Sequence, residues 1–352
     1  VAMTGNIGIE GGGARYGHLQ TWGYNYHGMM QKPPAGSVGM KGAGGPVGEF
    51  VSDSGEKSEY SDRALNINQT AQGILDASEP PVRMLWVASK NPFAQDFDRN
   101  KMIKAFEKLE MVVCVDQFFN ETVQHADIVL PVTTTFEQWD VSSSYWHYWL
   151  SVNEPAIKPL YECKSDPEIA ALLSKTINKL EAGSCTFPQE FDAKRWLDQE
   201  FNEGMGKQFG IAGWDDLLEG PRKAKMVSTA AWYDRKFKTP SGKYEFKSER
   251  CAENGHTALP EYKAGAQGAL PFHLFTPHLQ YGLHSQFVNL DWMQVFWPEP
   301  FVYIHPSAAQ KKGITEGAHV KVFNESGHVE LRAKITTNVP EDFLVMYESW
   351  FN

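Results

Sequence analysis

Two short polar segments that follow apolar runs are the first candidates for binding chemistry. Ser89 and Asn91 come directly after one apolar run, and Val115 and Asp116 end the next. Open α/β sheets bind ligands outside the carboxyl ends of their strands. A turn there can direct backbone N–H groups at a phosphate, and a strand-end carboxylate can accept hydrogen bonds from ribose hydroxyls. The pattern indicates a nucleotide site, although a simple turn or helix cap explains the same residues more economically.

The cysteines offer no metal or disulfide chemistry. None of the four forms a CxxC pair that could open a zinc or iron-sulfur site, and they are widely spaced: Cys114, Cys163, Cys185 and Cys251. Cys114 lies within an apolar run, so we expect a small buried hydrophobic residue there. We therefore predict no metal ligand, no cluster and no disulfide framework in this chain.

Short apolar runs alternate with helical spacing in the first half of the chain. Strands are expected at 82–88, 111–115 and 128–130, with helices around 102–109 and 121–126. Strands that are apolar on both faces and alternate with helices are typical of a parallel sheet covered on both sides. This region therefore predicts a doubly wound αβα domain, with residues 1–78 forming a long ordered Gly-rich loop before it.

The pattern changes toward the end of the chain. Helices are expected near 167–182, 188–204 and 214–218, and one strand at 242–247. Short β segments then follow at 272–275, 302–304, 319–323 and 329–335, separated by Gly-containing turns. We expect an αβα segment over residues 1–185, a helical connector over 186–267 and a β-barrel over 268–352 that lacks strands, with the chain truncated at both ends.

Composition excludes several classes of partner. The 352 residues carry 33 Lys and Arg against 43 Asp and Glu, a formal net charge of -10, with no dense basic block. Nucleic acid is therefore not an expected partner. The longest apolar runs are far shorter than the roughly 20 residues of a membrane-spanning helix, so no direct membrane span is expected. The compartment stays open between the cytoplasm and the periplasm of a prokaryote.

A longer stretch around Asp116 resembles the molybdopterin oxidoreductases of the dimethyl sulfoxide reductase family. That pattern is a strand ending in Asp, then Glu-Thr, then Ala-Asp-Val-Val-Leu-Pro and a nearby Glu; here it reads Asp116, Glu121-Thr122, Ala126-Asp127-Ile-Val-Leu-Pro131 and Glu137. The resemblance extends to four further segments: Thr4–Gly13, Thr239–Phe246, Phe275–Ser285 and His305–Val320. It covers nearly the whole chain.

The resemblance implies both a fold and a cofactor. The fold would be the second half of a discontinuous αβα domain, a connector and most of a cofactor-binding barrel. The cofactor would be a bis(molybdopterin guanine dinucleotide) carrying Mo or W. By position, Ser89, Asn91, Val115 and Asp116 would meet a guanosine and its phosphates, and Asp166 would face the guanine, whose N1–H and N2–H a carboxylate can accept.

The barrel side would contribute a loop that lines the pterin. Its contacts would be Thr276, Pro277, His278, His284 and Ser285. Hydroxyls and imidazoles suit a ring that alternates donors and acceptors. A core histidine satisfied by backbone is an equally good explanation of His284. Relatives often have Gly-Arg where this chain has Pro277-His278, so a guanidinium that grips phosphate is not expected there.

Other polar and aromatic residues have simpler explanations. Asp127 is expected to tie a turn, and Glu137 to do the same. The run Tyr145, Trp146, Tyr148 and Trp149 could wall a substrate funnel, but packing explains such aromatic spacing better.

No catalytic residue or metal ligand is expected in this chain. In relatives the metal-ligating residue and the iron-sulfur motif lie upstream of the matching segment. The implied partners are therefore the remainder of the catalytic subunit and an iron-sulfur electron-transfer subunit. The expected function is two-electron oxo transfer at Mo or W, with this segment binding the cofactor. Alternatives are a non-redox hydratase on the same scaffold and a stand-alone nucleotide-binding module.

Overall fold

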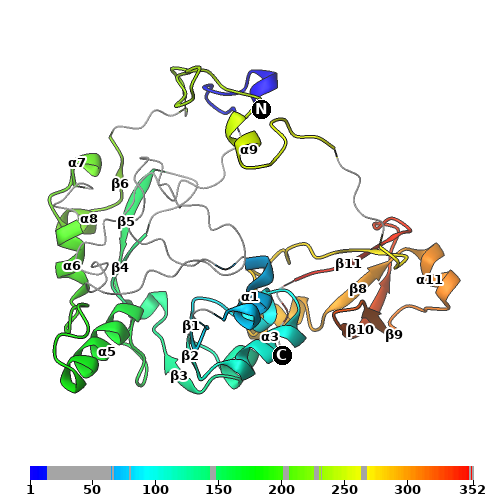
Figure 1. Cartoon of the computed structure of the whole chain (residues 1–352), viewed down its shortest axis with the longest axis horizontal. Coiled ribbons are helices and arrows are strands. Elements are labelled where there is room, and N and C mark those ends of the chain that lie inside the picture. The colour runs from blue at the N-terminus through cyan, green and yellow to red at the C-terminus, as the bar shows by residue number, and fades with distance from the viewer. Residues whose placement is uncertain are drawn as a thin grey trace. The chain divides into compact units, whose positions relative to one another are not determined.

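The protein is described by a computed structural model that covers most of the chain. The described residues are 1–13, 65, 67–78, 81–142, 148–200, 206–225, 230, 232–262, 268–348 and 350. The chain divides into two compact units, Val1–Pro34 with Thr133–Ala266 and Ala35–Val132 with Gln267–Asn352 (Figure 1). No helix in the described ranges has the length and apolar character that crossing a bilayer requires. The domain boundaries expected at residues 185 and 267 stay predictions.

A three-stranded parallel sheet lies in the second unit, as predicted. Its strands are β1 (Met84–Ala88), β2 (Met111–Asp116) and β3 (Ile128–Pro131), in the order β1-β2-β3. The central strand β2 is buried from Val112 to Val115. Four successive buried residues place apolar side chains on both faces, which is why this run carries no alternating pattern.

Short helices connect and cover these strands. They are α1 (Thr70–Asp76), α2 (Pro92–Gln95), α3 (Arg99–Lys108) and α4 (Glu121–Gln124). Ala71 and Ile74 of α1 pack in one buried cluster with Met102 and Phe106 of α3. Helix α1 corrects the expectation that residues 1–78 are irregular throughout, because two buried apolar residues suffice for a seven-residue helix that packs on a neighbour. Most of the expected loop, residues 14–64, lies outside the described residues.

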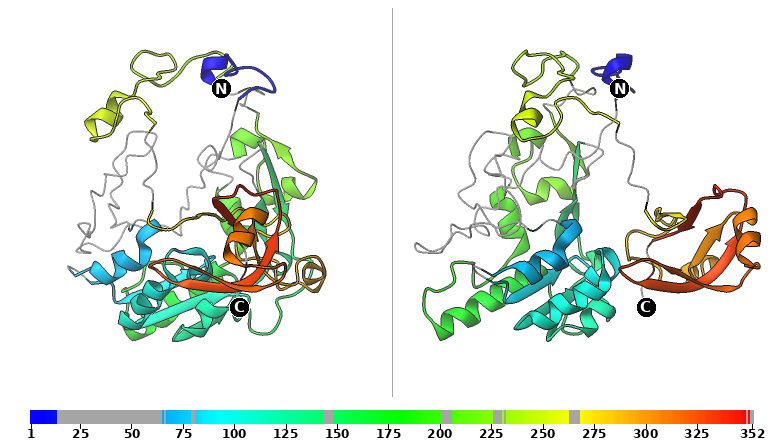
Figure 2. Two further views of the ribbon diagram at one scale, coloured as in Figure 1. Left: turned by 90° about the vertical axis from the view of Figure 1, so that its right-hand side faces the viewer. Right: turned by 45° about the vertical axis from the view of Figure 1, so that its right-hand side comes forward.

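The same unit contains a five-stranded sheet that curls into a half-barrel (Figure 2). Its strands are β7 (His273–Phe275), β8 (Phe301–Ile304), β9 (His319–Phe323), β10 (His328–Ile335) and β11 (Phe343–Met346). The order is β7-β11-β8-β10-β9, in which β7 pairs with β11 in parallel. Strands β7 and β11, which come first and last in the sequence of this sheet, are therefore neighbours. The segments that follow these two strands lie close together.

Two helices accompany the half-barrel in the second unit. Helix α11 (Pro306–Lys312) ends at Gly313, whose φ of 67° is the left-handed conformation that glycine adopts without strain. Its buried Ala308 and Ala309 pack against Ile304 of β8. Helix α10 (Asp291–Phe296) buries Met293 with Leu279 and Val288 in a separate small cluster. That cluster anchors the loop expected to line the pterin at Leu279, within the loop, and at Val288, just after it.

The first unit is built on a small antiparallel sheet. Its strands are β4 (Asp140–Ser142), β5 (Trp149–Asn153) and β6 (Arg222–Lys223). Helices α5 (Asp166–Leu180), α6 (Ala193–Glu200), α7 (Gly206–Phe209) and α8 (Trp214–Leu218) belong to the same unit. Leu150 of β5 packs with Trp214 and Leu217 of α8 in the core of this unit. The expected helices near 167–182, 188–204 and 214–218 are present with these bounds.

The remaining short elements belong to the first unit, except η2, which precedes α1 in the second unit. They are 3₁₀ turns η1 (Ala2–Thr4), η2 (Ile67–Gln69) and η3 (Thr135–Glu137), and helix α9 (Glu249–Glu253). The strand expected at 242–247 is absent and its segment is a turn, so that prediction was wrong. Side chains supply the physical reason: the Thr239 hydroxyl donates to the Lys243 carbonyl, and the Glu245 carboxylate accepts the Ser241 N–H. Such local bonds give the backbone an alternative to a ladder.

Candidate functional site

The carboxyl ends of β1 and β2 bring three of the predicted contacts to one edge of the sheet. Ala88 pairs with Val115, and the same register places Ser89 opposite Asp116. Ser89 has a φ of 53°, a left-handed conformation that is uncommon for a residue with a side chain. A residue in this conformation is strained and persists only where the surrounding structure holds it. Such residues occur often at ligand-binding turns. The predicted turn after β1 is therefore present at the expected edge.

Asn91 links this edge to the half-barrel. It is buried, at 6% exposure, and its amide oxygen accepts a hydrogen bond of 2.6 Å from the Thr122 hydroxyl. Its Nδ2 donates to the Ser285 hydroxyl at 3.3 Å, and Gln95 Nε2 donates to the same oxygen at 3.3 Å. Two predicted contacts far apart in sequence thus meet directly. Gln95 and Thr122 complete the network; Thr122 lies in the Glu121-Thr122 pair of the family pattern but was not predicted as a contact, and nothing in the local sequence marks Gln95.

Asp116 uses its carboxylate within its own turn. One oxygen accepts the Phe118 N–H at 3.0 Å, and the other accepts Asn120 Nδ2 at 2.8 Å. This is the turn-cap role that the sequence favoured for an isolated strand-end Asp. Because an ionised carboxylate offers about four lone-pair positions, acceptor capacity remains for a ribose. Val115, beside it, is buried at 3% exposure, so only its backbone could contact a nucleotide.

The loop after β7 presents its polar residues to solvent. Thr276, Pro277, His278 and His284 are exposed, and Ser285 is half-buried. His284 has a φ of 51° within the tight turn that the Leu283–Gln286 bridge closes. The exposed imidazole rules out the alternative of a core histidine satisfied by backbone. The same exposure makes the His284 imidazole accessible to a ligand.

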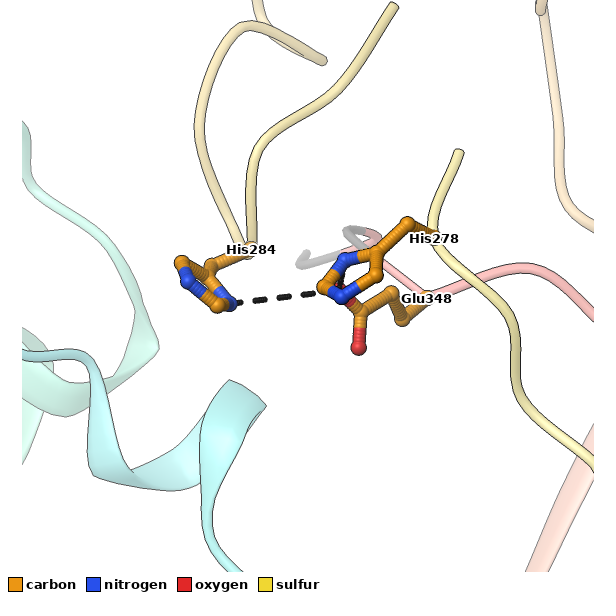
Figure 3. A group of neighbouring side chains, drawn as sticks. All are labelled: His278, His284 and Glu348. Carbon is orange, nitrogen blue, oxygen red and sulfur yellow. Dashed lines mark ion pairs between the residues drawn. The ribbon is translucent and has the colours of Figure 1, made fainter. Parts of the chain in front are cut away.

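A glutamate that the sequence did not indicate joins the two histidines (Figure 3). Glu348 Oε1 forms an ion pair with His278 Nδ1 and lies 3.9 Å from His284 Nδ1. The pairing follows from sheet register: Phe275 pairs with Val345, and the same offset places His278 opposite Glu348. The Glu348 N–H donates to the Pro277 carbonyl at 3.0 Å, which extends this pairing past the strand ends. Only the parallel β7–β11 ladder could have revealed the contact.

Asp166 lies in the other compact unit, so its distance from these residues is undefined. It is the first residue of α5, whose start is closed by a capping box between Ser165 and Glu168. Partial desolvation of its carboxyl raises the pKa of Asp166, although the residue as a whole is exposed. Its predicted contact with guanine stays a prediction.

The two carboxylates expected to tie turns do so. Asp127 accepts the Val112 N–H at 2.7 Å, which joins the start of β2 to the turn before β3. Glu137 accepts N–H bonds from Thr134 at 2.7 Å and Leu160 at 2.6 Å. These bonds, with the Thr134 backbone the largest contribution, lower the pKa of Glu137.

The cysteine and aromatic expectations have separate outcomes. Cys114 is buried, as expected, and its burial raises the pKa of the thiol to about 11. Tyr148 packs against the core of the first unit, whereas Trp149 is 46% exposed. Tyr145 and Trp146 lie outside the described residues.

A cavity in the described part of the chain lies elsewhere. A hollow of about 630 Å³ is lined mainly by apolar residues of all five half-barrel strands, among them Leu274, Ile304 and Met346, with polar residues such as Arg99 and Asn100 at its margin. It contains none of the predicted contacts. Cofactor recognition by hydroxyls, amides and imidazoles requires polar groups, so we place the candidate site at the strand tips and the 276–286 loop instead.

Two protein-family models match this chain. The "Molybdopterin oxidoreductase" model matches residues 1–176, and the "Molydopterin dinucleotide binding domain" model matches residues 272–352. The second match includes His278, His284, Ser285 and Glu348. The first includes Ser89, Asn91 and Asp116.

Two reductases have matching sequences. Dimethyl sulfoxide/trimethylamine N-oxide reductase of Cereibacter sphaeroides is 28% identical over all of this chain and 46% of its own length. Trimethylamine-N-oxide reductase 1 of Escherichia coli K12 is 27% identical over all of this chain and 45% of its own length. The chain therefore spans less than half the length of these relatives.

A solved structure shares the fold. Acetylene hydratase from Pelobacter acetylenicus superposes with a TM-score of 0.67 at 19% identity, covering 82% of this chain and 40% of that one. At this identity the likeness concerns the fold, an α/β domain together with a β domain.

Proposed function

Because this chain belongs to the molybdopterin oxidoreductase family, we propose that it is the cofactor-holding portion of an enzyme that reduces a sulfoxide or an amine N-oxide. Family membership and the dinucleotide-binding domain at residues 272–352 support the cofactor. The substrate class follows the names of the relatives from Cereibacter sphaeroides and Escherichia coli. The observation that carries the proposal is the hydrogen bond between Asn91 and Ser285, because it joins the strand-tip turn to the loop of the dinucleotide-binding domain.

The residues at this junction fit a pterin dinucleotide. The ligand alternates hydrogen-bond donors and acceptors along its rings and carries phosphates between them. The junction offers an amide at Asn91, a hydroxyl at Ser285 and two exposed imidazoles at His278 and His284. Each can donate or accept according to the group it meets. The site thus offers several groups that can each donate or accept a hydrogen bond.

We assign the nucleotide end to the sheet and the pterin end to the loop. Ser89, Asn91 and the Val115 backbone would hold phosphates and guanosine, with the spare lone pairs of Asp116 on the ribose. Residues 276–285 would line the pterin. Asp166 would accept from the guanine of one dinucleotide. The cofactor would be the bis form, with Mo or W as its metal.

The bound cofactor supplies the redox chemistry. In the proposed reaction the sulfoxide or N-oxide takes up two electrons and two protons and gives the sulfide or amine and one water. The described residues would hold and orient the dinucleotide, since protein groups tune such cofactors instead of performing the hard step. We propose that the metal-ligating residue comes from the remainder of the catalytic subunit and that an iron-sulfur subunit exchanges the electrons.

The test uses the intact catalytic subunit that contains this chain. Reduced viologen would be supplied as electron donor, with dimethyl sulfoxide or trimethylamine N-oxide as acceptor. Acceptor-dependent viologen oxidation, together with molybdenum or tungsten and GMP released on denaturation, is the expected result. A metal-loaded enzyme that hydrates an alkyne and oxidises no viologen would overturn the redox proposal in favour of a hydratase.

A second measurement distinguishes the proposed portion of a larger enzyme from a stand-alone nucleotide-binding module. The chain of residues 1–352 on its own should retain the dinucleotide poorly, because the remainder of the subunit would supply much of the binding site. A tight one-to-one dinucleotide complex of this chain would contradict the assignment and favour a stand-alone nucleotide-binding module.

A further inference from the structure

The cluster of His278, His284 and Glu348 has the composition of a metal site. Its candidate ligand atoms, one from each residue, lie within 4.8 Å of one another. Two imidazoles and one carboxylate, with a position left open to water, form a donor set that zinc enzymes use. We propose that, in the chain without its pterin cofactor, this cluster binds one divalent transition-metal ion such as zinc.

The carboxylate is the fixed member of the cluster. Glu348 Oε1 is shielded from solvent and accepts no hydrogen bond from the described residues. It is paired only with the two histidines, and no lysine or arginine in the described part of the chain lies within ion-pair distance of it. A shielded carboxylate oxygen that faces only two imidazole nitrogens can be satisfied by a cation that all three groups share. The cluster has a formal charge of -1 when both imidazoles are neutral, which favours a dication.

Backbone geometry holds the three residues near one another. The register of β7 and β11, continued by the hydrogen bond from Glu348 N–H to the Pro277 carbonyl, places Glu348 beside His278. His284 is held by its left-handed turn, and its ring lies edge to face with the His278 ring at a centroid distance of 5.6 Å. Figure 3 shows the two imidazoles converging on the carboxylate from separate segments.

A small movement would bring the donors to coordination distance. Zinc bonds of about 2.0–2.1 Å in a tetrahedron set neighbouring donors roughly 3.3 Å apart. His278 and His284 side chains are 68% and 56% exposed, so their rings can rotate without disturbing a core. The same exposure leaves one coordination position for water. Metal and pterin would then compete for the same imidazoles, so the metal would bind the cofactor-free protein.

The test is metal binding by the cofactor-free chain after chelator treatment. Co²⁺ reports four-coordination through its visible absorption, and Zn²⁺ is then titrated calorimetrically and by displacement of Co²⁺. One equivalent is expected to bind. His278→Ala and Glu348→Gln should weaken binding by at least about 100-fold, because even outer partners of metal ligands are worth about 10–100-fold. His319→Ala, which removes an exposed histidine of β9, should have no effect.

Several results would overturn the site. These are no binding by the unmodified chain, unchanged affinity in the two ligand variants, or an equal loss in His319→Ala. Circular dichroism checks that each variant folds; if Glu348→Gln does not, His278→Ala decides alone, since its side chain is largely exposed. The titration uses no molybdenum cofactor, so its failure would leave the proposed redox function untouched.

Discussion

Asn91 Nδ2 donates a hydrogen bond to the Ser285 hydroxyl at 3.3 Å and thereby joins the turn after β1 to the loop after β7. Asn91 is buried and also accepts the Thr122 hydroxyl, so its amide is held at both ends. The two elements that this bond connects carry most of the predicted cofactor contacts. Its strength therefore decides how well the site is organised before any ligand arrives.

A double-mutant cycle of Asn91→Ala and Ser285→Ala measures this connection. We expect a coupling free energy of about 0.5–1.5 kcal/mol, the net value of one hydrogen bond. Asn91→Ala alone should cost more, about 1–3 kcal/mol, because it leaves the Thr122 hydroxyl buried without its partner. Denaturant unfolding supplies the four free energies. The matched control pairs Asn91→Ala with Ser307→Ala, whose hydroxyl contacts His305; equal coupling in both cycles would contradict the connection.

Asp116→Ala should lower both stability and cofactor content. Loss of the bonds to the Phe118 N–H and Asn120 should reduce the free energy of unfolding by about 1–3 kcal/mol. In the intact subunit, molybdenum or tungsten and GMP per folded protein should also fall. Asp127→Ala is the control, since it loses a comparable turn bond to Val112 and has no assigned ligand. Similar cofactor content in the two variants would show that Asp116 acts only on its turn.

Glu137 should contribute to the loss of stability in acid. Its pKa lies below the ordinary value of 4.5 because backbone N–H groups of Thr134 and Leu160 bond its ionised form. The folded state therefore favours the charged carboxylate, and this stabilisation is present above the ordinary carboxyl pKa and is lost as pH falls through the lowered one. Glu137→Gln should lower the Tm near neutral pH, and its deficit should shrink as the pH is lowered below the ordinary value of 4.5. A deficit that stays constant across that range would contradict a charge-dependent role.

The cysteines should differ sharply in reactivity. Cys114 is buried and its thiol has a pKa raised to about 11, so almost none of it is thiolate near neutral pH. Cys251 is exposed on α9. Iodoacetamide followed by peptide mass spectrometry should find Cys251 alkylated in the native chain and Cys114 only after denaturation. Rapid alkylation of native Cys114 would show that β2 is not the buried centre of its sheet.

The sequence by itself determined the parts of the fold whose side chains are buried on both faces. The run from Met111 to Val115 is apolar throughout because β2 lies between two neighbours and under helices, so this short continuous apolar run identifies it as a strand. The turn-tying roles of Asp127 and Glu137 were also predictable, since each acts on residues close in sequence or at a strand start. The family followed from the segment around Asp116.

Local side-chain hydrogen bonds and weak apolar patterns explain why other parts of the fold could not be predicted from the sequence. The 242–247 segment reads as a strand by its alternation, but Thr239 and Glu245 bond its backbone into a turn. Helix α1 has only Ala71 and Ile74 buried within a polar Gly-rich region, and packing against α3 is what stabilises it. Such contacts depend on neighbours that residue spacing does not reveal.

The sequence alone indicated Ser89, Asn91 and Asp116 as candidates, because their types and places after strands suit a polar ligand. His284 and Ser285 became candidates only through the family resemblance. Only the tertiary structure decided which of them meet. Asn91 reaches Ser285, and the β7–β11 register brings Glu348 to His278, although Glu348 has no distinguishing motif. The physical reason is that a strand's partner and register are fixed by packing between distant segments, whereas burial and turn chemistry are written in neighbouring residues.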